Sequence, residues 1–246
     1  MSYLITARTN VRAALFNVYI RIAMKNIWIT GGSRGIGLET VKAFLADHFT
    51  VVVLTRNCNA LAGLQEQYPK TLICKSIDLI NIRKDDLPKL QVDALINNAG
   101  ALVNKSFDSI TSEDLHRVYR TNVFGPIHLI QMLMPQFSKG IHVVNISSIG
   151  GVAGSVKFAG LSAYSSSKGA LSILTECLQA EYGESTNWTF NCLALGAVQT
   201  EMLEEAFPGY QAPVYPEQMA EYIKHFTLNN HKVMRGRVVE VSLSTP

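Results

Sequence analysis

Tyr164 and Lys168 are the residues of this chain whose types and spacing best suit proton transfer. They stand four positions apart in a helical pattern over residues 163–182, so both side chains would project from the same face of the helix. A phenol with its ordinary pKa of about 10 is a poor base at neutral pH. A neighbouring ammonium group favours the phenolate, which would lower the pKa of Tyr164 so that it exchanges a proton near pH 7. Tyrosine and lysine at this spacing also occur by chance, so the pair needs support from the rest of the chain.

A glycine-rich turn near the start of the chain suits a bound pyrophosphate. The short apolar run 27–29 stops at Thr30 and is followed by Gly31, Gly35 and Gly37, after which apolar residues recur at helical spacing. This pattern predicts a strand, a turn and a helix. The glycines let the backbone come close to a pyrophosphate, and the helix N-terminus offers it free N–H donors and a partial positive charge.

Three more short motifs follow the glycine turn along the chain. They are Asn97-Asn98-Ala99-Gly100 after the apolar run 94–96, Ser147-Ser148 at the end of another apolar run, and Tyr164-Ser165-Ser166-Ser167-Lys168. Together with the turn, these motifs resemble the short-chain dehydrogenase/reductase family from about Lys25 to the C-terminus. The resemblance implies an oxidoreductase that interconverts a ketone or aldehyde with an alcohol, by hydride transfer involving a nicotinamide dinucleotide.

The same resemblance implies roles for four catalytic residues. Tyr164 would be the general acid in carbonyl reduction, and Lys168 would tune its pKa and hold the nicotinamide ribose. Ser148 would contact the substrate oxygen, with Ser147 as the alternative serine. Asn122 would support a proton-relay water, and an asparagine within a helix is otherwise unfavourable, which fits a special role.

Two arginines indicate which cofactor is used. The second predicted strand ends in Leu54-Thr55-Arg56-Asn57, with no acid to bind the 2′-hydroxyl of NAD. A guanidinium matches a phosphate, and Arg34 in the glycine turn would approach from the other side, so we expect NADP(H) to be preferred over NAD(H). The alternative is that one arginine is merely solvated. The other positions that the resemblance assigns to the cofactor are Gly31, Ser33, Gly35, Ile36, Gly37, Asp78, Leu79, Asn98, Ala99, Gly100, Val198 and Thr200, together with Tyr164 and Lys168.

Apolar residues near the expected substrate end predict an apolar pocket. The gap between Ser148 and Tyr164 is a few residues longer than is usual in the family. The surplus falls in the loop 150–162, which is expected to border the substrate. The segment 201–216 is expected to be a mobile flap over the site. The candidate lining residues are Ile149, Phe158, Leu161, Met202, Leu203, Phe207 and Tyr210, although each could equally serve ordinary packing.

Strand-like and helical segments alternate along the chain, and their order must position the residues above. The strand-like runs are 27–30, 51–55, 72–76, 94–97, 142–147, 189–195 and 238–241, and the helical patterns are 38–47, 60–67, 112–134 and 163–182. This alternation predicts an α/β fold with a Rossmann-like, doubly wound, seven-stranded parallel sheet and helices on both faces. We expect a single catalytic domain over residues 24–246.

The composition fits a globular domain and argues against several function classes. Hydrophobic residues make up 48% and charged residues 17%. The net charge is +3, and once the arginines of the first 24 residues are set aside, basic and acidic residues balance at 19 each, so no nucleic-acid partner is expected. The four cysteines indicate neither a disulfide framework nor a metal site. Cys74 and Cys192 are expected to be buried thiols in a reducing, cytoplasmic setting.

Residues 1–23 are expected to be an upstream extension that packs poorly, with a targeting segment as the alternative. Their apolar run is too short for a membrane span of about 20 residues, so no membrane partner is expected. The resemblance implies a small-molecule carbonyl or alcohol substrate and a homodimer or homotetramer built on the helices 112–134 and 163–182. The rival is a non-catalytic dinucleotide-binding sensor or scaffold of the same fold. A sugar-nucleotide epimerase or dehydratase fits this short chain poorly.

Overall fold

Seven parallel strands form the centre of the molecule, in the order β3-β2-β1-β4-β5-β6-β7. The computed structural model describes residues 26–244, and the expected extension over residues 1–23 lies outside them. The strands are β1 (Asn26–Thr30), β2 (Thr50–Thr55), β3 (Leu72–Ser76), β4 (Val92–Asn97), β5 (Phe137–Ser148), β6 (Thr189–Leu195) and β7 (Val238–Val241). The central strands are almost fully buried because helices cover both faces of the sheet. The predicted doubly wound, seven-stranded parallel sheet is confirmed.

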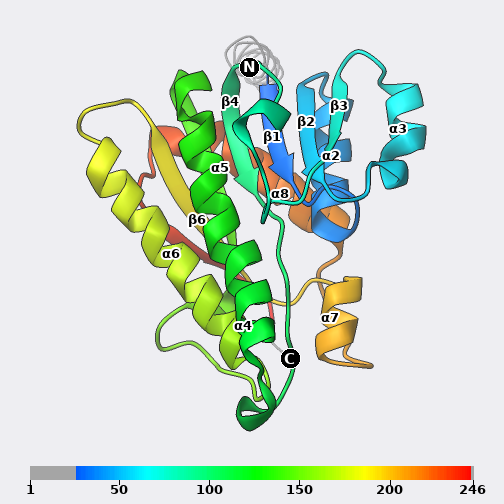
Figure 1. Cartoon of the computed structure of the whole chain (residues 1–246), viewed down its shortest axis with the longest axis vertical. Helices are drawn as coiled ribbons and strands as arrows, with labels where there is room; N and C mark the ends of the chain where they lie inside the picture. The colour runs from blue at the N-terminus through cyan, green and yellow to red at the C-terminus, as the bar shows by residue number, and fades with distance from the viewer. Residues whose placement is uncertain (1–25, 245–246) are drawn as a thin grey trace, which may run out of the picture.

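Helices pack against both faces of this sheet (Figure 1). α2 (Gly35–Ala46) and α8 (Pro216–Asn229) contact each other and bury their apolar residues in a core on one face. α5 (Gly125–Leu133) and α6 (Ser162–Tyr182) contribute to a second core on the other face. The shorter helices are α3 (Ala62–Gln67), α4 (Ser112–Tyr119) and α7 (Glu201–Ala206). Within residues 26–244, no helix is long and apolar enough to span a membrane.

One disulfide joins the segment after β2 to β3. Cys58, at the start of a 3₁₀ turn (Cys58–Leu61), is bonded to Cys74 in β3, with their Cα atoms 5.9 Å apart. The expectation that Cys74 is a buried thiol is therefore wrong, whereas Cys192 is a buried free thiol and Cys177 an exposed one. Parallel pairing with β2 places Cys74 opposite Val53, close to where the chain leaves β2, and no cysteine spacing reveals this. The argument from unpaired cysteines for a reducing, cytoplasmic setting loses its support.

A neutral histidine lies inside the sheet. His142 in β5 has no exposed surface, and its Nδ1 lies 2.9 Å from the carbonyl oxygen of Thr227 in α8. Its Nε2 lies 3.0 Å from Nδ2 of Asn191 in β6. Burial, aided by the nearby ring of His231, lowers the pKa of His142 to about 3. The ring therefore joins α8 to the sheet in its uncharged form.

We expect this histidine to make the fold less stable in acid. The pKa of an unfolded histidine is about 6.5, so between that pH and about 3 the unfolded chain binds a proton that the folded protein excludes. The free energy of unfolding should therefore fall as the pH falls through this window, by about 2 kcal/mol from this residue at pH 5. Urea unfolding at pH 7.5 and 5 should show a smaller acid-induced loss in His142→Gln than in wild type. The exposed His116→Gln variant is the control, and an equal loss in all three proteins would contradict the assignment.

Candidate active site

A cavity of about 610 Å³ opens at the carboxyl ends of the strands. It lies where the strand order reverses between β1 and β4, the position at which sheets of this topology bind ligands. The predicted site residues that line it are Gly31, Ser33, Arg34, Gly35, Ile36, Gly37, Arg56, Asp78, Leu79, Asn98, Ala99, Gly100, Ser148, Tyr164, Lys168, Val198 and Thr200. Asn122 is not among the lining residues and has no exposed surface. No group of side chains in residues 26–244 is arranged to hold a metal ion.

Two close approaches of the backbone shape the glycine turn. Gly31 has a φ of +69°, and a Cβ atom there would lie 2.8 Å from the Cα of Ala99. A Cβ atom on Gly37 would collide with the carbonyl oxygen of Gly31 and with the side chain of Asn98. Only glycine fits both positions, because one needs a left-handed backbone and the other leaves no room for a side chain. The turn therefore presents bare backbone to the cavity at the N-terminus of α2.

Thr30 joins the glycine turn to the loop that follows β4. Its Oγ1 accepts hydrogen bonds from the backbone N–H groups of Asn98 and Ala99, each at 3.0 Å. In return, Nδ2 of Asn98 donates to the carbonyl oxygens of Thr30 and Gly31, each at 3.1 Å. The sequence patterns did not assign Thr30 to the site, although a hydroxyl residue that ends a buried strand is a visible signal. These bonds hold two cavity-lining loops in a fixed relation.

Helix α6 brings Tyr164 and Lys168 to one end of the cavity. Lys168 is 3% exposed, and its Nζ donates a hydrogen bond of 2.8 Å to the carbonyl oxygen of Ile146 in β5. The same Nζ lies 5.8 Å from the centre of the Tyr164 ring. The Ser148 side chain, at the end of β5, hydrogen-bonds to the Tyr164 side chain. A serine hydroxyl, a phenol and an ammonium group therefore converge from two elements.

The surroundings raise the pKa of Tyr164. Burial raises it to about 12, and the hydrogen bond with Ser148 opposes this only in part. The expectation of a lowered pKa is wrong for this structure, because the burial of the phenol outweighs the opposing effect of Ser148. Burial also lowers the pKa of Lys168 to about 8. At neutral pH, Tyr164 is protonated and Lys168 keeps most of its charge.

The two adjacent serines have different partners. Ser147 is 3% exposed, and its Oγ donates to the carbonyl oxygen of Lys168 at 2.8 Å and accepts from Oγ of Ser172 at 3.1 Å. The Ser148 hydroxyl lies beside the phenol of Tyr164. Ser147 therefore anchors α6 to the sheet, whereas Ser148 lies beside Tyr164 at the cavity.

A π-helical turn carries Asn122. The helix expected over residues 112–134 consists of α4 and α5, joined by the π-helical turn Arg120–Phe124. Oδ1 of Asn122 accepts a hydrogen bond of 2.8 Å from the backbone N–H of Ala101. Its Nδ2 donates to the carbonyl oxygen of Ala101 and to Oγ of Ser167, each at 2.9 Å. Asn122 therefore ties the loop after β4 to α6, and such rare turns are frequent at functional sites.

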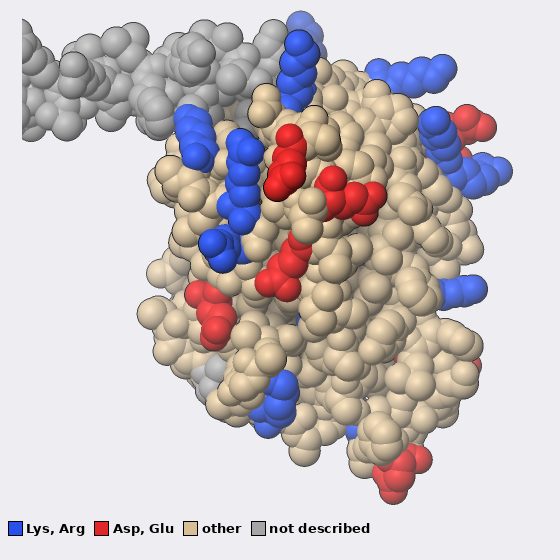
Figure 2. All heavy atoms as spheres, turned by 90° about the vertical axis from the view of Figure 1, so that its left-hand side faces the viewer, with Lys and Arg blue, Asp and Glu red and all other residues tan. Residues whose placement is uncertain are grey.

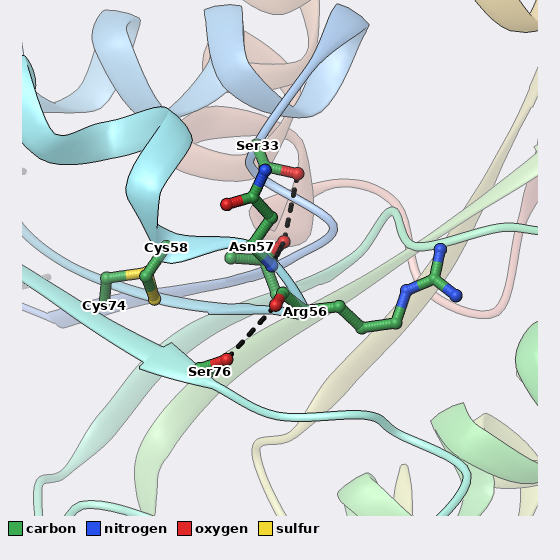
Figure 3. The surroundings of a disulfide bond; sticks show 7 residues. Ser33, Arg56, Asn57, Cys58, Cys74 and Ser76 are labelled. Atoms are coloured by element: carbon green, nitrogen blue, oxygen red, sulfur yellow. Dashed lines mark hydrogen bonds between the residues drawn. A yellow bond between two sulfur atoms is a disulfide. The ribbon is translucent and has the colours of Figure 1, made fainter.

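Arg34 and Arg56 reach the cavity from two sides. Among residues 26–244, no hydrogen bond or ion pair holds the exposed guanidinium of Arg56, so its charge is available to an anion. Nη1 of Arg34 lies 3.7 Å from Oε1 of Glu205 in α7, in an ion pair whose side chains are both more than half exposed. Thr55 Oγ1 donates to Ser33 Oγ at 3.0 Å, which joins the two segments that carry the arginines (Figure 3).

Comparison with known proteins identifies the family. The family model described as short chain dehydrogenase matches residues 25–211. The chain belongs to the short-chain dehydrogenase family. It is similar to a fatty acyl-CoA reductase of Acinetobacter baylyi, with 31% identity over 89% of this chain and 77% of that protein. It is also similar to carbonyl reductase [NADPH] 2 of Sus scrofa, with 30% identity over 63% of this chain and 64% of that protein.

The fold recurs in solved structures of this oxidoreductase family. The structure of 4-hydroxyisoleucine dehydrogenase complexed with NADH matches with a TM-score of 0.75 and 27% identity. The match covers 89% of this chain and 97% of that one. This short-chain dehydrogenase therefore shares its architecture with a protein whose structure contains a nicotinamide dinucleotide.

An aromatic pair lines the cavity beside α7. Phe158, in the loop before α6, and Phe207, directly after α7, pack edge to face with ring centres 5.2 Å apart. Nδ2 of Asn104 donates to the carbonyl oxygen of Ala206 at 2.8 Å, so the loop after β4 also holds the end of α7. The predicted apolar residues that line the cavity are Ile149, Phe158, Leu161, Met202, Leu203 and Phe207. The expectation for Tyr210 is wrong, because its hydroxyl lies 3.0 Å from Oγ of Ser244, outside the lining set.

Proposed function

We propose that this protein is an NADP(H)-dependent oxidoreductase that interconverts a ketone or aldehyde with an alcohol by hydride transfer. The observation that carries the proposal is that Ser148, Tyr164 and Lys168 share one cavity with the glycine turn and two arginines. Similarity to a fatty acyl-CoA reductase and to a carbonyl reductase supports chemistry at a carbonyl group. When bound, the cofactor supplies the hydride, and the protein orients the substrate and handles the proton.

The residues of the cavity fit a dinucleotide that carries a 2′-phosphate. The space that a Cβ atom would fill at Gly31 and Gly37 lets the backbone approach a pyrophosphate, at a helix N-terminus that attracts anions. Arg34 and Arg56 would hold the 2′-phosphate. The carboxylate of Asp78 would accept a hydrogen bond from the adenine amino group. Lys168 would hold the nicotinamide ribose. The remaining contacts would come from Ser33, Gly35, Ile36, Leu79, Asn98, Ala99, Gly100, Tyr164, Val198 and Thr200.

Tyr164 is suited to donate the proton in carbonyl reduction. Its phenol, with a pKa of about 12, is protonated at neutral pH. Ser148 would hydrogen-bond to the carbonyl oxygen. The phenolic proton of Tyr164 would pass to that oxygen as the alcohol forms. The positive charge of Lys168 favours the phenolate that remains, and Asn122 would position a water that restores the proton.

The first test measures NADPH and NADH consumption with a panel of aldehydes, ketones and diketones. Turnover that favours NADPH would support the proposal. Binding of NADPH without turnover of any carbonyl would favour the alternative, a non-catalytic dinucleotide-binding sensor or scaffold of the same fold. Equal affinity for NADPH and NADH in a titration would contradict the cofactor preference.

Replacing Arg56 with alanine should weaken NADPH binding by about tenfold or more, because a hydrogen bond to a charged group contributes about 1.5–3 kcal/mol. NADH binding should stay within about twofold, since NADH has no 2′-phosphate for a guanidinium to hold. Isothermal titration calorimetry measures both dissociation constants. The matched control is Arg83→Ala, because Arg83 is exposed and pairs with Asp86 at 2.9 Å outside the cavity. An equal loss for both cofactors would contradict the assignment of Arg56 to the 2′-phosphate.

Exposed apolar side chains support self-association through the helices around α6. Leu115, Phe124 and Ile173 are 42%, 46% and 62% exposed. The face on the α6 side of the molecule carries mixed charges at one end and a wide area without charged side chains (Figure 2). Contiguous exposed apolar patches mark contact surfaces. We therefore propose a homodimer or homotetramer built on these helices, as the family resemblance implies.

A further inference from the structure

The Cys58–Cys74 disulfide lies two residues from Arg56, at the edge of the cavity. We propose that this pair is a reversible thiol–disulfide site, and that its reduction by a dithiol weakens the binding of a cofactor that carries a 2′-phosphate. The inference rests on the proposed function in one respect, the assignment of the 2′-phosphate to Arg56.

The disulfide completes the attachment of the Arg56 turn to β3. Before Arg56, the backbone N–H of Ile77 donates to the carbonyl oxygen of Thr55 at 2.8 Å. At Arg56 itself, Oγ of Ser76 donates to the carbonyl oxygen at 3.1 Å (Figure 3). After Arg56, Cys58 is bonded to Cys74. The turn is therefore attached to β3 and the residue after it both before and after the Arg56 side chain. The attachment on the C-terminal side of Arg56 is the disulfide.

Reduction would release this short turn and leave the fold in place. Beyond the turn, Leu61 is fully buried in the core, and Leu64 and Tyr68 pack against the same core. Within the turn, Asn57 is exposed, and its backbone N–H lies 3.5 Å from Oγ1 of Thr55, which is a long contact for a hydrogen bond. The loss of the covalent link should therefore widen the range of positions that Arg56 samples.

The disulfide is accessible to a reductant. β3 is an edge strand of the sheet, and Cys58 and Cys74 are both partly exposed. Of the other cysteines, Cys192 is buried and Cys177 is exposed without a disulfide partner. Cys58 and Cys74 are therefore both disulfide-bonded and partly exposed to solvent. Access of the reductant to the sulfur atoms is one of the conditions that govern thiol–disulfide exchange.

The exchange needs a dithiol reductant, which supplies two electrons. Its thiolate attacks Sγ of one cysteine, the S–S bond breaks, and the other cysteine leaves as a thiolate that takes up a proton. The second thiol of the reductant then attacks the mixed disulfide and displaces the first cysteine, which is also protonated. The protein ends with two thiols and the reductant ends with one disulfide. A disulfide oxidant such as glutathione disulfide reverses the process.

The effect should be largest at the 2′-phosphate, because Arg56 lies two residues from Cys58. The glycine turn and the loop after β4 are held to each other by hydrogen bonds between Thr30 and Asn98, which do not involve the segment after Arg56. An apparent dissociation constant rises in inverse proportion to the fraction of protein in the binding-competent conformation. If the released turn is competent in about one third of molecules, the dissociation constant of NADPH rises about threefold. That of NADH should change much less.

The test compares full-length protein oxidised with glutathione disulfide and protein held reduced with dithiothreitol, with the state of each cysteine measured by alkylation and mass spectrometry. Calorimetry gives the dissociation constants of NADPH, NADH, adenosine 2′,5′-bisphosphate and 5′-AMP. We expect reduction to weaken the binding of NADPH and of the bisphosphate, and to leave that of NADH and 5′-AMP nearly unchanged. The double variant Cys58→Ser, Cys74→Ser should bind like the reduced protein in both conditions, and Cys177→Ser should behave like wild type.

Several results would overturn the proposal. These are equal affinities in the two redox states, an equal loss for all four ligands, or a redox effect that persists in the double serine variant. A Cys58–Cys74 pair that stays oxidised in dithiothreitol would do so as well. The Arg56→Ala measurement separates this failure from that of the proposed function. If the alanine variant loses NADPH affinity but reduction has no effect, Arg56 keeps its assignment and the redox site is rejected.

Discussion

Replacing Tyr164 with phenylalanine should lower kcat by about 10²- to 10⁴-fold, the range that a positioned general acid contributes. The change removes one oxygen atom from a residue that lines the cavity and leaves its ring in place. The glycine turn and the arginines are untouched, so the dissociation constant of NADPH should stay within about twofold. Steady-state kinetics with the best carbonyl of the panel, together with calorimetry, measure the two effects separately.

Tyr119→Phe is the matched control for this change. Tyr119 lies on α4, and its hydroxyl donates to Oγ of Ser166 at 3.0 Å, outside the cavity lining. This variant should keep most of the wild-type rate. A Tyr164→Phe protein that loses NADPH affinity as strongly as it loses rate would show that the tyrosine serves binding, and the proton-donor assignment would then fail.

Replacing Lys168 with methionine should abolish most of the turnover and at the same time stabilise the fold. Lys168 is 3% exposed, and burial lowers its pKa to about 8. An unfolded lysine has a pKa of about 10.4. Below pH 8 the ammonium group is therefore charged in both states, but its burial in the folded protein costs free energy. The penalty is about 3 kcal/mol at neutral pH, from which about 1 kcal/mol for the lost hydrogen bond to Ile146 must be subtracted. We expect a net gain of about 1–3 kcal/mol, at the expense of catalysis.

The dependence on pH separates this explanation from a simple gain in packing. Between pH 8 and about 10.4 the unfolded state binds more protons at this residue than the folded state, so the stability of the wild type should rise with pH relative to that of Lys168→Met. Urea unfolding at pH 7 and 9 measures the difference. Lys139→Met, at an exposed position of β5, is the control and should change the stability little. A Lys168→Met protein less stable than wild type at pH 7 would contradict the assigned cost of the buried charge.

Most of the fold could be predicted because its strands are continuous apolar runs. Strands of a parallel sheet that is covered on both faces do not alternate apolar with polar residues. The predicted runs at β1, β2 and β6 coincide with the observed strands within one residue. The sequence patterns do not predict α8, although Pro216 stands at its first position, where proline is favoured. The cluster of prolines and aromatic residues that precedes Pro216 predicts a mobile flap that includes this proline.

The parts of the site that could not be predicted depend on distances across the fold. Three of the motifs point to the cavity because each stands at the end of a strand, and the strand ends meet at one edge of the sheet. The fourth, Tyr164 to Lys168, lies within α6 and points there through the spacing of its two residues on one helix face. The motifs did not indicate the raised pKa of Tyr164, because the charge of Lys168 is visible in the sequence but the burial of the phenol is not. Nor did they indicate the disulfide, which depends on the register between β2 and β3.

The π-helical turn at Arg120–Phe124 has a consequence for evolution. A residue advances an α-helix by about 100°, so one extra residue shifts every side chain beyond it by roughly that angle. The side chain of Asn122 contacts Ala101 and Ser167. Because the extra residue rotates the helix beyond it, Leu129 and Leu133 can face the sheet at the same time. Deleting a single residue from the turn would turn the apolar stripe of α5 away from the core. Insertions and deletions should therefore be rare between Asn122 and Leu129, although the segment is helical throughout.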